Sequence, residues 1–504
     1  MVNIIRNITT LKTVCALILI LFISAFSYAQ VPHKVNTVYD AKGWKLQVDN
    51  ENFFVKGMVW GYCPVGENYS YNLWGQSDEF IKKVLHQEFT LLKDANVNTI
   101  RLFSVVPPKW ITYIYEQYGI MTIVNHLMGR YGYNIDGIWL ANTNYQDELT
   151  RETLINDFVA MVEEFKDVKG VLMFALGNEN NYGLHWSSFE IENLPKDEQH
   201  KGKAKFLYTM YNEAIAAARK VDQNHPYMIV NGDIQYLDLI VEHCKQVDIL
   251  GVNCYRGISF TDLWERVDKE ANLPVLFTEF GSDAFNAMTM QEEQLGQAVI
   301  VKGNWQEIYN KSYGKGEEAN ALGGCQFQWR DEWWKYKQTE NLDIHDKTAS
   351  WSNGGYYFDF APGFNNMNEE WFGICAIGEP DEDGIYATES RMTYDILKEI
   401  WSIDLYKTDK KTMNRKIDAI DMEQLQYTAE TRSLKLDKKK NDRFRLVGGK
   451  LEGELVFHGE SYKVEKDGKD GMNFSNGEML FLDFEFQPTN RLKGDFTLNI
   501  LGNV

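Results

Sequence analysis

Short apolar runs alternate with longer amphipathic stretches over most of the chain. Eight runs rich in β-branched and aromatic residues each end in polar residues or glycine, which predicts eight strands. Between several of them, apolar residues recur with the spacing of a helix. The strands are expected near residues 53–60, 97–103, 120–126, 170–177, 226–232, 247–253, 274–280 and 323–329, and helices near residues 80–94, 204–221, 291–309 and 390–403.

This alternation predicts an α/β fold with parallel strands, because parallel neighbours need crossover connections. Eight strand–helix units over roughly 275 residues match a (β/α)8 TIM barrel, whose usual size is about 250 residues. We therefore expect one barrel over residues 30–405. An open doubly wound sheet is the alternative, but no glycine-rich phosphate loop follows the first strand.

The composition changes after the barrel. Two-residue alternation in 451-LEGELVFHG-459 and 479-MLFLDFEFQ-487 predicts a small antiparallel β module over residues 406–504. The polar segment at 408–416 and the lysine-rich run at 437–443 are expected to be solvated hairpin loops. The module would bind carbohydrate or cap the barrel.

The start of the chain has the pattern of a secretory signal peptide. Arg6 and Lys12 precede an apolar run at 14–26, and Ser27-Tyr28-Ala29 offers small residues for cleavage after Ala29. The run is too short for a membrane span, and no later segment is apolar for long enough. We expect residues 1–29 to be removed and the protein to be exported to the periplasm or cell exterior, without membrane insertion.

Charge and cysteine content exclude several classes of function. A formal net charge of −20 at pH 7 repels phosphate backbones and anionic lipids, so nucleic acid is not an expected partner. Polyanionic substrates are disfavoured only weakly, because a local cleft can differ from the average. The six cysteines are widely spaced, so neither a disulfide framework nor a zinc site is expected, and no cofactor or metal is predicted.

Two glutamates stand where two of the predicted strands end. Glu179 follows the fourth strand in 174-FALGNEN-180, and Glu279 ends the seventh in 274-PVLFTEFGSD-283. In a barrel of this type, the active site lies at the carboxyl ends of the strands. We therefore expect the two carboxylates to converge on one mouth of the barrel.

A pair of carboxylates at one mouth suits the cleavage of a glycosidic bond. One must be protonated to donate to the leaving oxygen, and the other must stay ionised to attack or stabilise the sugar carbon. Arg101 and the hydroxyl of Tyr255 would hold Glu279 as a carboxylate. Apolar neighbours and the charge of Glu279 would raise the pKa of Glu179.

Several motifs resemble a known group of enzymes. These are 98-NTIRLFSVVPPKW-110, 118-YGIMTIVNH-126, LGNE at 176–179, VNCYRG at 252–257, TEFG at 278–281, GGCQFQW at 323–329 and 371-WFGI-374. Together they resemble the clan of retaining glycoside hydrolases whose glutamates follow barrel strands four and seven. The pattern is most similar to the barrel of family 2 β-glycosidases and more distantly to β-1,3-glucanosyltransferases, and it covers residues 50–400.

The resemblance implies a role for each candidate residue. Glu179 would be the acid/base, Glu279 the nucleophile, Asn178 the ligand of the sugar 2-hydroxyl, Arg101 and Tyr255 the groups that orient the nucleophile, and Trp329 the floor of the −1 subsite. His126 would contact a sugar hydroxyl or satisfy a loop carbonyl. The stretch after Arg101 reads Leu-Phe-Ser rather than the polar, His-containing turn common in that family, so the family's substrates are not carried over.

The sequence thus predicts an exported retaining β-glycosidase that acts on a neutral β-linked glycan, with a β-glucan favoured. A transglycosylase is a close variant, because a sugar can intercept the same covalent intermediate in place of water. A non-catalytic glycan-binding protein on a barrel scaffold is the alternative outside enzymes. A third possibility is a scaffold protein that uses the C-terminal module, but the sequence contains no repeat or linker that would favour it.

Overall fold

The computed structural model describes residues 32–440, 445–446, 450–457, 460–467, 472–473 and 496–501. The expected signal peptide, residues 1–29, lies outside the described residues. The chain divides into two compact units between Asp421 and Met422. Each unit is described by itself.

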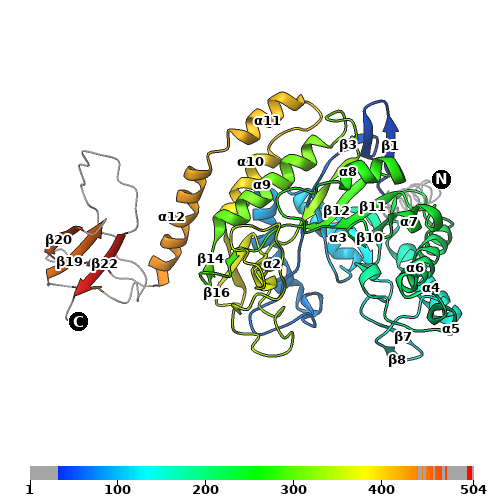
Figure 1. The fold of residues 1–504 in the computed structure, drawn as a ribbon, viewed down its shortest axis with the longest axis horizontal. Helices are drawn as coiled ribbons and strands as arrows, with labels where there is room; N and C mark the ends of the chain where they lie inside the picture. The colour runs from blue at the N-terminus through cyan, green and yellow to red at the C-terminus, as the bar shows by residue number, and fades with distance from the viewer. Residues whose placement is uncertain are drawn as a thin grey trace, which may run out of the picture. The chain divides into compact units, whose positions relative to one another are not determined.

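Eight parallel strands close into a barrel in the first unit, so the predicted fold class is confirmed (Figure 1). Each expected strand is present, and β15 pairs with β4 to close the ring. Helices cover the outside, so side chains on both faces of a strand are buried, which explains the continuous apolar runs. The barrel strands are β4 (Val55–Val59), β5 (Thr99–Arg101), β6 (Met121–His126), β9 (Val171–Leu176), β10 (Tyr227–Gly232), β11 (Ile249–Asn253), β12 (Val275–Phe280) and β15 (Ala321–Gln326).

The four expected helices are confirmed as α2, α6, α9 and α10. Helix α6 begins eight residues before the expected start, because its first turns are polar and lack an apolar repeat. Side-chain caps fix some helix starts: Ser77 accepts a hydrogen bond from the Phe80 amide at the start of α2. The main helices are α2 (Asp78–Asp94), α3 (Pro108–Tyr118), α4 (Glu148–Phe165), α6 (Lys196–Ala218), α7 (Leu237–His243), α8 (Leu263–Arg266), α9 (Gln294–Asn310) and α10 (Met392–Trp401).

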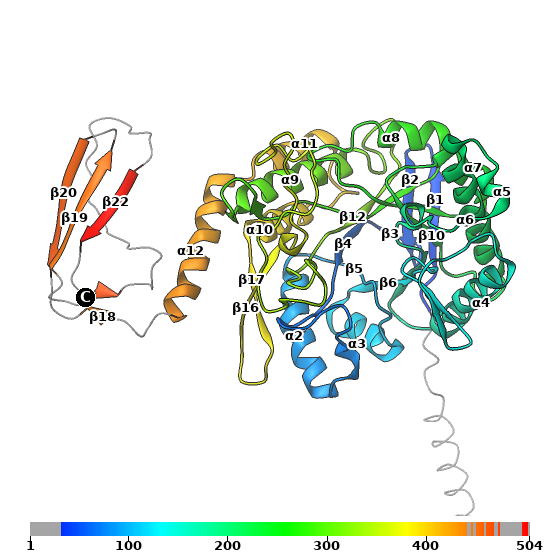
Figure 2. The same ribbon diagram turned by 60° about the horizontal axis from the view of Figure 1, so that its bottom comes forward.

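Short elements fill the connections between strands and helices. The hairpin β16–β17 stands beside α2, where Gln87 Nε2 donates to the Tyr386 carbonyl at 2.7 Å (Figure 2). The short elements are η1 (Leu73–Gly75), β7 (Tyr133–Ile135), β8 (Ile138–Leu140), η2 (Asn180–Tyr182), α5 (Phe189–Glu192), η3 (Val267–Ala271), β13 (Phe285–Asn286), β14 (Gln291–Glu292), η4 (Glu369–Trp371), β16 (Cys375–Pro380) and β17 (Tyr386–Ser390).

A small antiparallel sheet that the sequence did not predict precedes the barrel. It consists of β1 (Val35–Asp40), β2 (Gly43–Val48) and β3 (Glu51–Phe53). The Val35 amide donates to the Asn224 carbonyl at 2.7 Å and the Trp44 amide to the Ala319 carbonyl at 2.8 Å. Both acceptors precede barrel strands, so the sheet covers the amino ends of the strands. In Figure 1 it lies at the opposite end of the barrel from β7 and β8.

The lysine-rich segments after the barrel are helical, so the expectation of hairpin loops is wrong. Residues 408–416 contribute to α11 (Lys410–Asp418), which Asp409 caps and whose Asn414 accepts a hydrogen bond from Asn310 of α9 at 2.9 Å. The run at 437–443 begins inside α12 (Met422–Lys440). Polar helices of this kind have no apolar repeat that would reveal them.

The second unit contains antiparallel β structure, as expected. Strand β19 pairs with β20 and with β22, and β18 pairs with β21. The expected strand at 451–459 corresponds to β19, whereas residues 479–487 lie outside the described residues. The strands are β18 (Arg445–Leu446), β19 (Lys450–Phe457), β20 (Glu460–Asp467), β21 (Met472–Asn473) and β22 (Phe496–Leu501).

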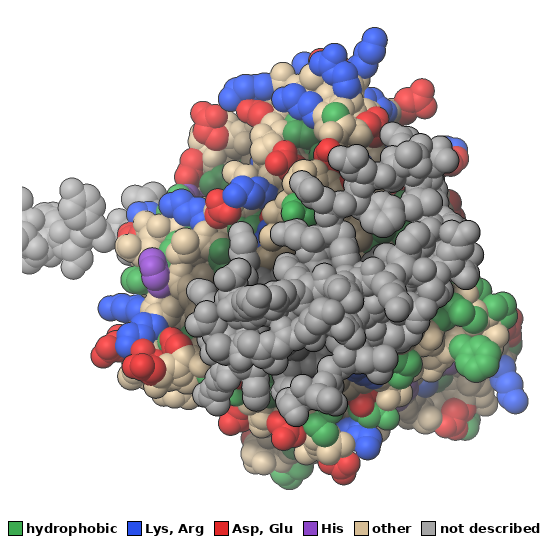
Figure 3. Space-filling model, turned by 90° about the vertical axis from the view of Figure 1, so that its left-hand side faces the viewer, with side chains coloured by type: hydrophobic (Ala, Val, Ile, Leu, Met, Phe, Trp, Pro, Cys, Tyr) green, Lys and Arg blue, Asp and Glu red, His purple; other side chains and the backbone are tan. Residues whose placement is uncertain are grey.

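The surface carries mixed charge. On the face drawn in Figure 3, acidic and basic side chains of the described residues lie next to one another. Over the described part of the chain, no helix is both long and apolar enough to cross a membrane.

A buried carboxylate ties three elements together near the end of β15. Glu88 of α2 is fully buried and accepts hydrogen bonds from the Trp329 indole, from Arg330 Nη1 at 2.9 Å and from the Thr388 hydroxyl of β17. The Arg330 side chain is only 3% exposed. Because a buried guanidinium needs a carboxylate to compensate its desolvation, this pair fixes where β15, α2 and β17 meet.

Replacing Glu88 by Gln should therefore destabilise the first unit. The change keeps the shape of the side chain but leaves the Arg330 charge buried and unpaired, which costs about 3 kcal/mol. The free energy of unfolding, measured by urea denaturation, is expected to fall by that amount. Glu79→Gln on the same helix is the control, because its ion pair with Lys83 is solvent-exposed and should contribute little. Equal losses in both variants would contradict this account of Glu88.

Candidate functional site

Glu179 is held in a tight turn directly after β9. Its φ is 56° and that of Gly177 is 83°, so both residues adopt the left-handed conformation. A Cβ atom at Gly177 would lie 2.1 Å from the Tyr211 hydroxyl, so a side chain does not fit there. The Glu179 amide donates to the Val230 carbonyl of β10 at 3.0 Å. A non-glycine residue with this φ is costly, and the surroundings must hold it in place.

The asparagines around Glu179 provide that support. Asn180 Oδ1 accepts from the Asn178 amide at 2.8 Å, and Asn180 Nδ2 donates to the Met128 carbonyl at 3.0 Å. Asn181 exchanges two hydrogen bonds with the backbone of Gly232, at 2.8 and 3.0 Å. The side-chain amides of Asn180 and Asn181 therefore fix the turn to the loop after β6 and to β10. The sequence analysis missed these two roles, although the run of asparagines after an apolar strand was visible.

The structure brings Arg101 and Tyr255 against Glu279, as the sequence analysis expected. The Glu279 side chain is 8% exposed, and its Oε1 accepts from Arg101 Nη1 at 2.8 Å. Its Oε2 accepts from the Tyr255 hydroxyl at 3.3 Å. Both carboxylate oxygens thus face a donor, one of them cationic. A hydrogen bond from a guanidinium to a carboxylate is charge-assisted, and it holds the carboxylate in a defined direction.

Arg101 is fully buried at the end of β5, and its side chain forms hydrogen bonds to several other residues of the site. Its Nη2 donates to Asn178 Oδ1 at 2.8 Å and its Nε to Asn125 Oδ1 at 3.3 Å. Asn253 Nδ2 also donates to Asn178 Oδ1, at 3.2 Å. One guanidinium therefore connects the carboxyl ends of β6, β9 and β12. The sequence analysis did not single out the side chains of Asn125 and Asn253, although each stands at or next to the last residue of its strand.

Glu179 and Glu279 experience different electrostatic surroundings. Burial raises the pKa of Glu179 to about 7, and the negative charge of Glu279 adds to the rise. A hydrogen bond from Asn253 and the charges of Arg130 and Arg101 lower that pKa in part. The Glu179 carboxyl can therefore carry a proton near neutrality, while Glu279 lies against a guanidinium and a phenol.

Aromatic rings line the site beside Tyr255. The Tyr255 ring meets Phe372 at 5.7 Å and Phe327 and Trp351 at 6.1 Å, measured between centroids. Phe327 follows the end of β15 and is 6% exposed. These rings hold Tyr255, whose hydroxyl donates to Glu279, in place.

The expectation that Trp329 forms a stacking floor is not supported. Its side chain is fully buried, its indole donates to Glu88 on α2, and its ring packs against Tyr394 of α10 at 6.2 Å. The side chain therefore lies on the outer face of the barrel wall. Sequence position alone did not reveal this, because the direction of a side chain beyond a strand end depends on the local turn. Phe327, two positions earlier, is one of the aromatic residues that contact Tyr255.

His126 forms a hydrogen bond to the loop that follows β6. Its Nδ1 accepts from the Met128 amide at 3.2 Å, and its ring packs against Phe158 of α4 at 6.1 Å. Burial lowers the pKa of His126 to about 4, so the ring is neutral at pH 7. The structure therefore shows a local contact with a loop amide, rather than with the loop carbonyl that the sequence analysis named.

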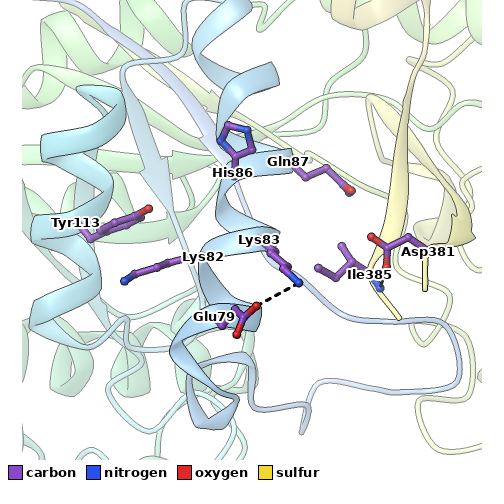
Figure 4. Close-up of a pocket in the computed structure, with 8 residues that line it drawn as sticks. All are labelled: Glu79, Lys82, Lys83, His86, Gln87, Tyr113, Asp381 and Ile385. Carbon is purple, nitrogen blue, oxygen red and sulfur yellow. Dashed lines mark hydrogen bonds and ion pairs between the residues drawn. The ribbon is translucent and has the colours of Figure 1, made fainter. Parts of the chain in front are cut away.

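A surface pocket lies on the outside of the barrel, between α2, α3 and the turn of the β16–β17 hairpin (Figure 4). No predicted catalytic or binding residue lines it, so it is separate from the site described above. Its lining residues are Glu79, Lys82, Lys83, His86, Gln87, Tyr113, Asp381 and Ile385. Among the residues that the structure describes, no three His, Cys, Asp or Glu side chains gather as metal ligands.

No protein-family model matches the chain, and no curated protein matches it significantly. Similar solved structures include a GH2 β-galacturonidase from Eisenbergiella tayi bound to galacturonate (12% identity, TM-score 0.45, covering 74% of this chain and 54% of that one). Others are β-glucuronidases from Ruminococcus gnavus (16%, TM-score 0.44, 74% and 53%) and Dictyoglomus thermophilum (14%, TM-score 0.43, 73% and 53%). The chain spans about half the length of these proteins. The likenesses are remote, so any activity must be inferred from this chain's own residues.

Replacing Glu279 by Gln should lower the pKa of Glu179. The substitution removes the negative charge that contributes to the rise, whereas burial, the larger cause, remains. The pKa of Glu179 is therefore expected to fall below 7 but to stay above its ordinary value of about 4.3. Infrared difference titration of the carboxyl band, with a Glu179→Gln/Glu279→Gln double variant as the blank, measures it. An unchanged pKa would show that the two charges do not interact.

Proposed function

We propose that the chain is a retaining glycoside hydrolase that cleaves β-glycosidic bonds, with a β-glucan as the first substrate to test. One observation carries the proposal: burial raises the pKa of Glu179 to about 7, and Glu179 interacts with the charge of Glu279, whose two oxygens accept hydrogen bonds from Arg101 and Tyr255. Pairs of carboxyl groups whose surroundings separate their acidities are the acid and the nucleophile of glycosidases.

Each group has a defined step in this mechanism. A Glu279 oxygen attacks the anomeric carbon while Glu179 gives its proton to the leaving oxygen, which forms a glycosyl ester and releases the leaving group. Glu179, now a carboxylate, takes a proton from water, and the resulting hydroxide oxygen displaces Glu279 from the sugar. Both glutamates then return to their starting protonation states.

Asn178 is placed to contribute through its amide nitrogen. Its Oδ1 already accepts hydrogen bonds from Arg101 and Asn253. Among the described residues, its Nδ2 bonds to the hydroxyl of Tyr131 alone, at 3.1 Å, so this nitrogen has a second hydrogen for a ligand. We assign it to a sugar hydroxyl next to the reacting carbon.

Azide should distinguish the two glutamates. With aryl β-glycosides, Glu279→Ala is expected to be inactive, because the covalent step is lost. Glu179→Ala should still form the ester from good leaving groups, and azide should then release it as the β-glycosyl azide. The control is Glu265→Ala, whose side chain makes an exposed ion pair with Lys269. Product anomers are read by NMR over a panel of aryl β-glycosides and β-glucans.

The outcomes of this panel separate the candidate functions. An α-configured azide from Glu179→Ala, or full activity in either variant, would contradict the assignment of the two roles. Transfer of the sugar to another sugar in preference to water would make the protein a transglycosylase. Glycan binding without turnover of any substrate would make the barrel a binding module.

The pH dependence should report on Glu179. Because the acid must be protonated, kcat/KM is expected to fall about tenfold per pH unit above about 7. Glu370 has a pKa that burial also raises to about 7, but it only accepts backbone hydrogen bonds in the loop after β15, at 2.6 and 3.0 Å. Glu370→Gln should therefore keep the alkaline limb, whereas Glu179→Ala should lose it with good leaving groups. If Glu370→Gln abolished the fall of kcat/KM at alkaline pH and Glu179→Ala kept it, the fall would be assigned to Glu370.

A further inference from the structure

Arg130 lies next to the catalytic turn and has no acidic partner. In the part of the chain that the structure describes, no carboxylate oxygen lies within 4.0 Å of its guanidinium, and its buried Nε has no hydrogen-bond partner. Other arginines of the first unit do have such partners: Arg101, Arg151, Arg219, Arg256, Arg266, Arg330 and Arg391. An unpaired guanidinium in an acidic protein has capacity for an anion.

Arg130 lies on the same side of the site as Glu179. A Cβ atom at Gly183, directly after the η2 turn that follows Glu179, would lie 3.0 Å from Arg130 Nη1. The charge of Arg130 also lowers the pKa of Glu179, so the two groups interact. Because Glu179 gives its proton to the leaving oxygen, groups on this side of the site meet the leaving group.

Tyr131 supplies a flat surface beside this charge. Its hydroxyl accepts the hydrogen bond from Asn178 Nδ2, so the residue belongs to the catalytic centre, yet the residue is 56% exposed. The Arg130 guanidinium carbon lies 5.0 Å from the centroid of the Tyr131 ring. The following hairpin is fixed to α4, where the Tyr133 and Thr150 hydroxyls are 2.7 Å apart. The ring is therefore a firmly placed, open surface of the size of a sugar.

We propose that Arg130 and Tyr131 form a subsite for a leaving-group sugar that carries an anionic substituent such as a carboxylate. The proposal rests on the proposed glycosidase function and narrows its substrate. A guanidinium binds a carboxylate through two parallel hydrogen bonds, and an aromatic ring stacks on the apolar face of a pyranose. The net charge of −20 repels anions over the surface as a whole, so one unpaired cation inside the site is what would select an acidic residue.

Acceptor competition tests this subsite. An acceptor sugar that intercepts the covalent intermediate occupies the place of the leaving group, by microscopic reversibility. An aryl β-glycoside hydrolysed by the wild type is the donor, with equal concentrations of methyl β-D-glucuronide and methyl β-D-glucoside as acceptors. Mass spectrometry gives the ratio of the two transfer products.

We expect the wild type to favour the glucuronide. Arg130→Gln should lower the ratio of acidic to neutral product about tenfold or more, as for the loss of a charge-assisted hydrogen bond. Arg415→Gln, an exposed arginine on α11, should leave the ratio unchanged. Tyr131→Ala should reduce transfer to both acceptors, and Tyr131→Phe, which keeps the ring, should restore it.

The possible results separate this inference from the proposed function. Equal transfer to both acceptors, or a ratio that Arg130→Gln leaves unchanged, would overturn the anionic subsite while the glycosidase function stands. If no aryl glycoside is hydrolysed, the proposed function fails. In that case, calorimetry measures the affinity of methyl β-D-glucuronide for the wild type and for Arg130→Gln, which tests the anionic subsite without catalysis. Equal affinities would overturn the subsite.

Discussion

The site depends on one buried guanidinium. Arg101 has no contact with solvent, so its charge is tolerable only if its donors are all satisfied. Glu279 supplies the compensating negative charge, and the Thr278 carbonyl and the amide oxygens of Asn125 and Asn178 accept further hydrogen bonds from the guanidinium. Because the fork of a guanidinium is planar and rigid, satisfying it fixes three strand ends relative to one another. The positions of the Glu279 carboxylate and of the Asn178 amide follow from this constraint.

The opposite surroundings of Glu179 give the pair its asymmetry. Its turn presents amides and a left-handed backbone but no directly bonded cation, so burial dominates and the proton is retained near neutrality. A second buried arginine bonded to Glu179 would remove the difference between the two acids. The barrel thus gives the two glutamates different surroundings, because a buried guanidinium is bonded to Glu279 and burial dominates at Glu179.

The sequence predicted the parts of the structure that a repeated pattern reveals. The eight strands were visible because both of their faces are buried. Glu179 and Glu279 were visible because each stands near the carboxyl end of such a strand. The β1–β3 sheet was missed because its strands are mostly half-buried and lack a continuous apolar run, and α11 and α12 because they are polar. Trp329 was misplaced, since sequence does not show which way a side chain points after β15. The roles of Asn125 and Asn253 rest on hydrogen bonds to Arg101 and to Asn178, which form only when the chain is folded.

The crowded turn after β9 has a consequence for changing this protein by design. Gly177 has no room for a side chain, and the asparagine bonds around Glu179 leave the turn no freedom to shift. The β7–β8 hairpin, in contrast, projects exposed side chains such as Ile138 and Trp139 and is two short strands long. Changes to these exposed side chains would leave the turn after β9 undisturbed. The fold therefore separates a part that must be inherited unchanged from a part in which new preferences can arise.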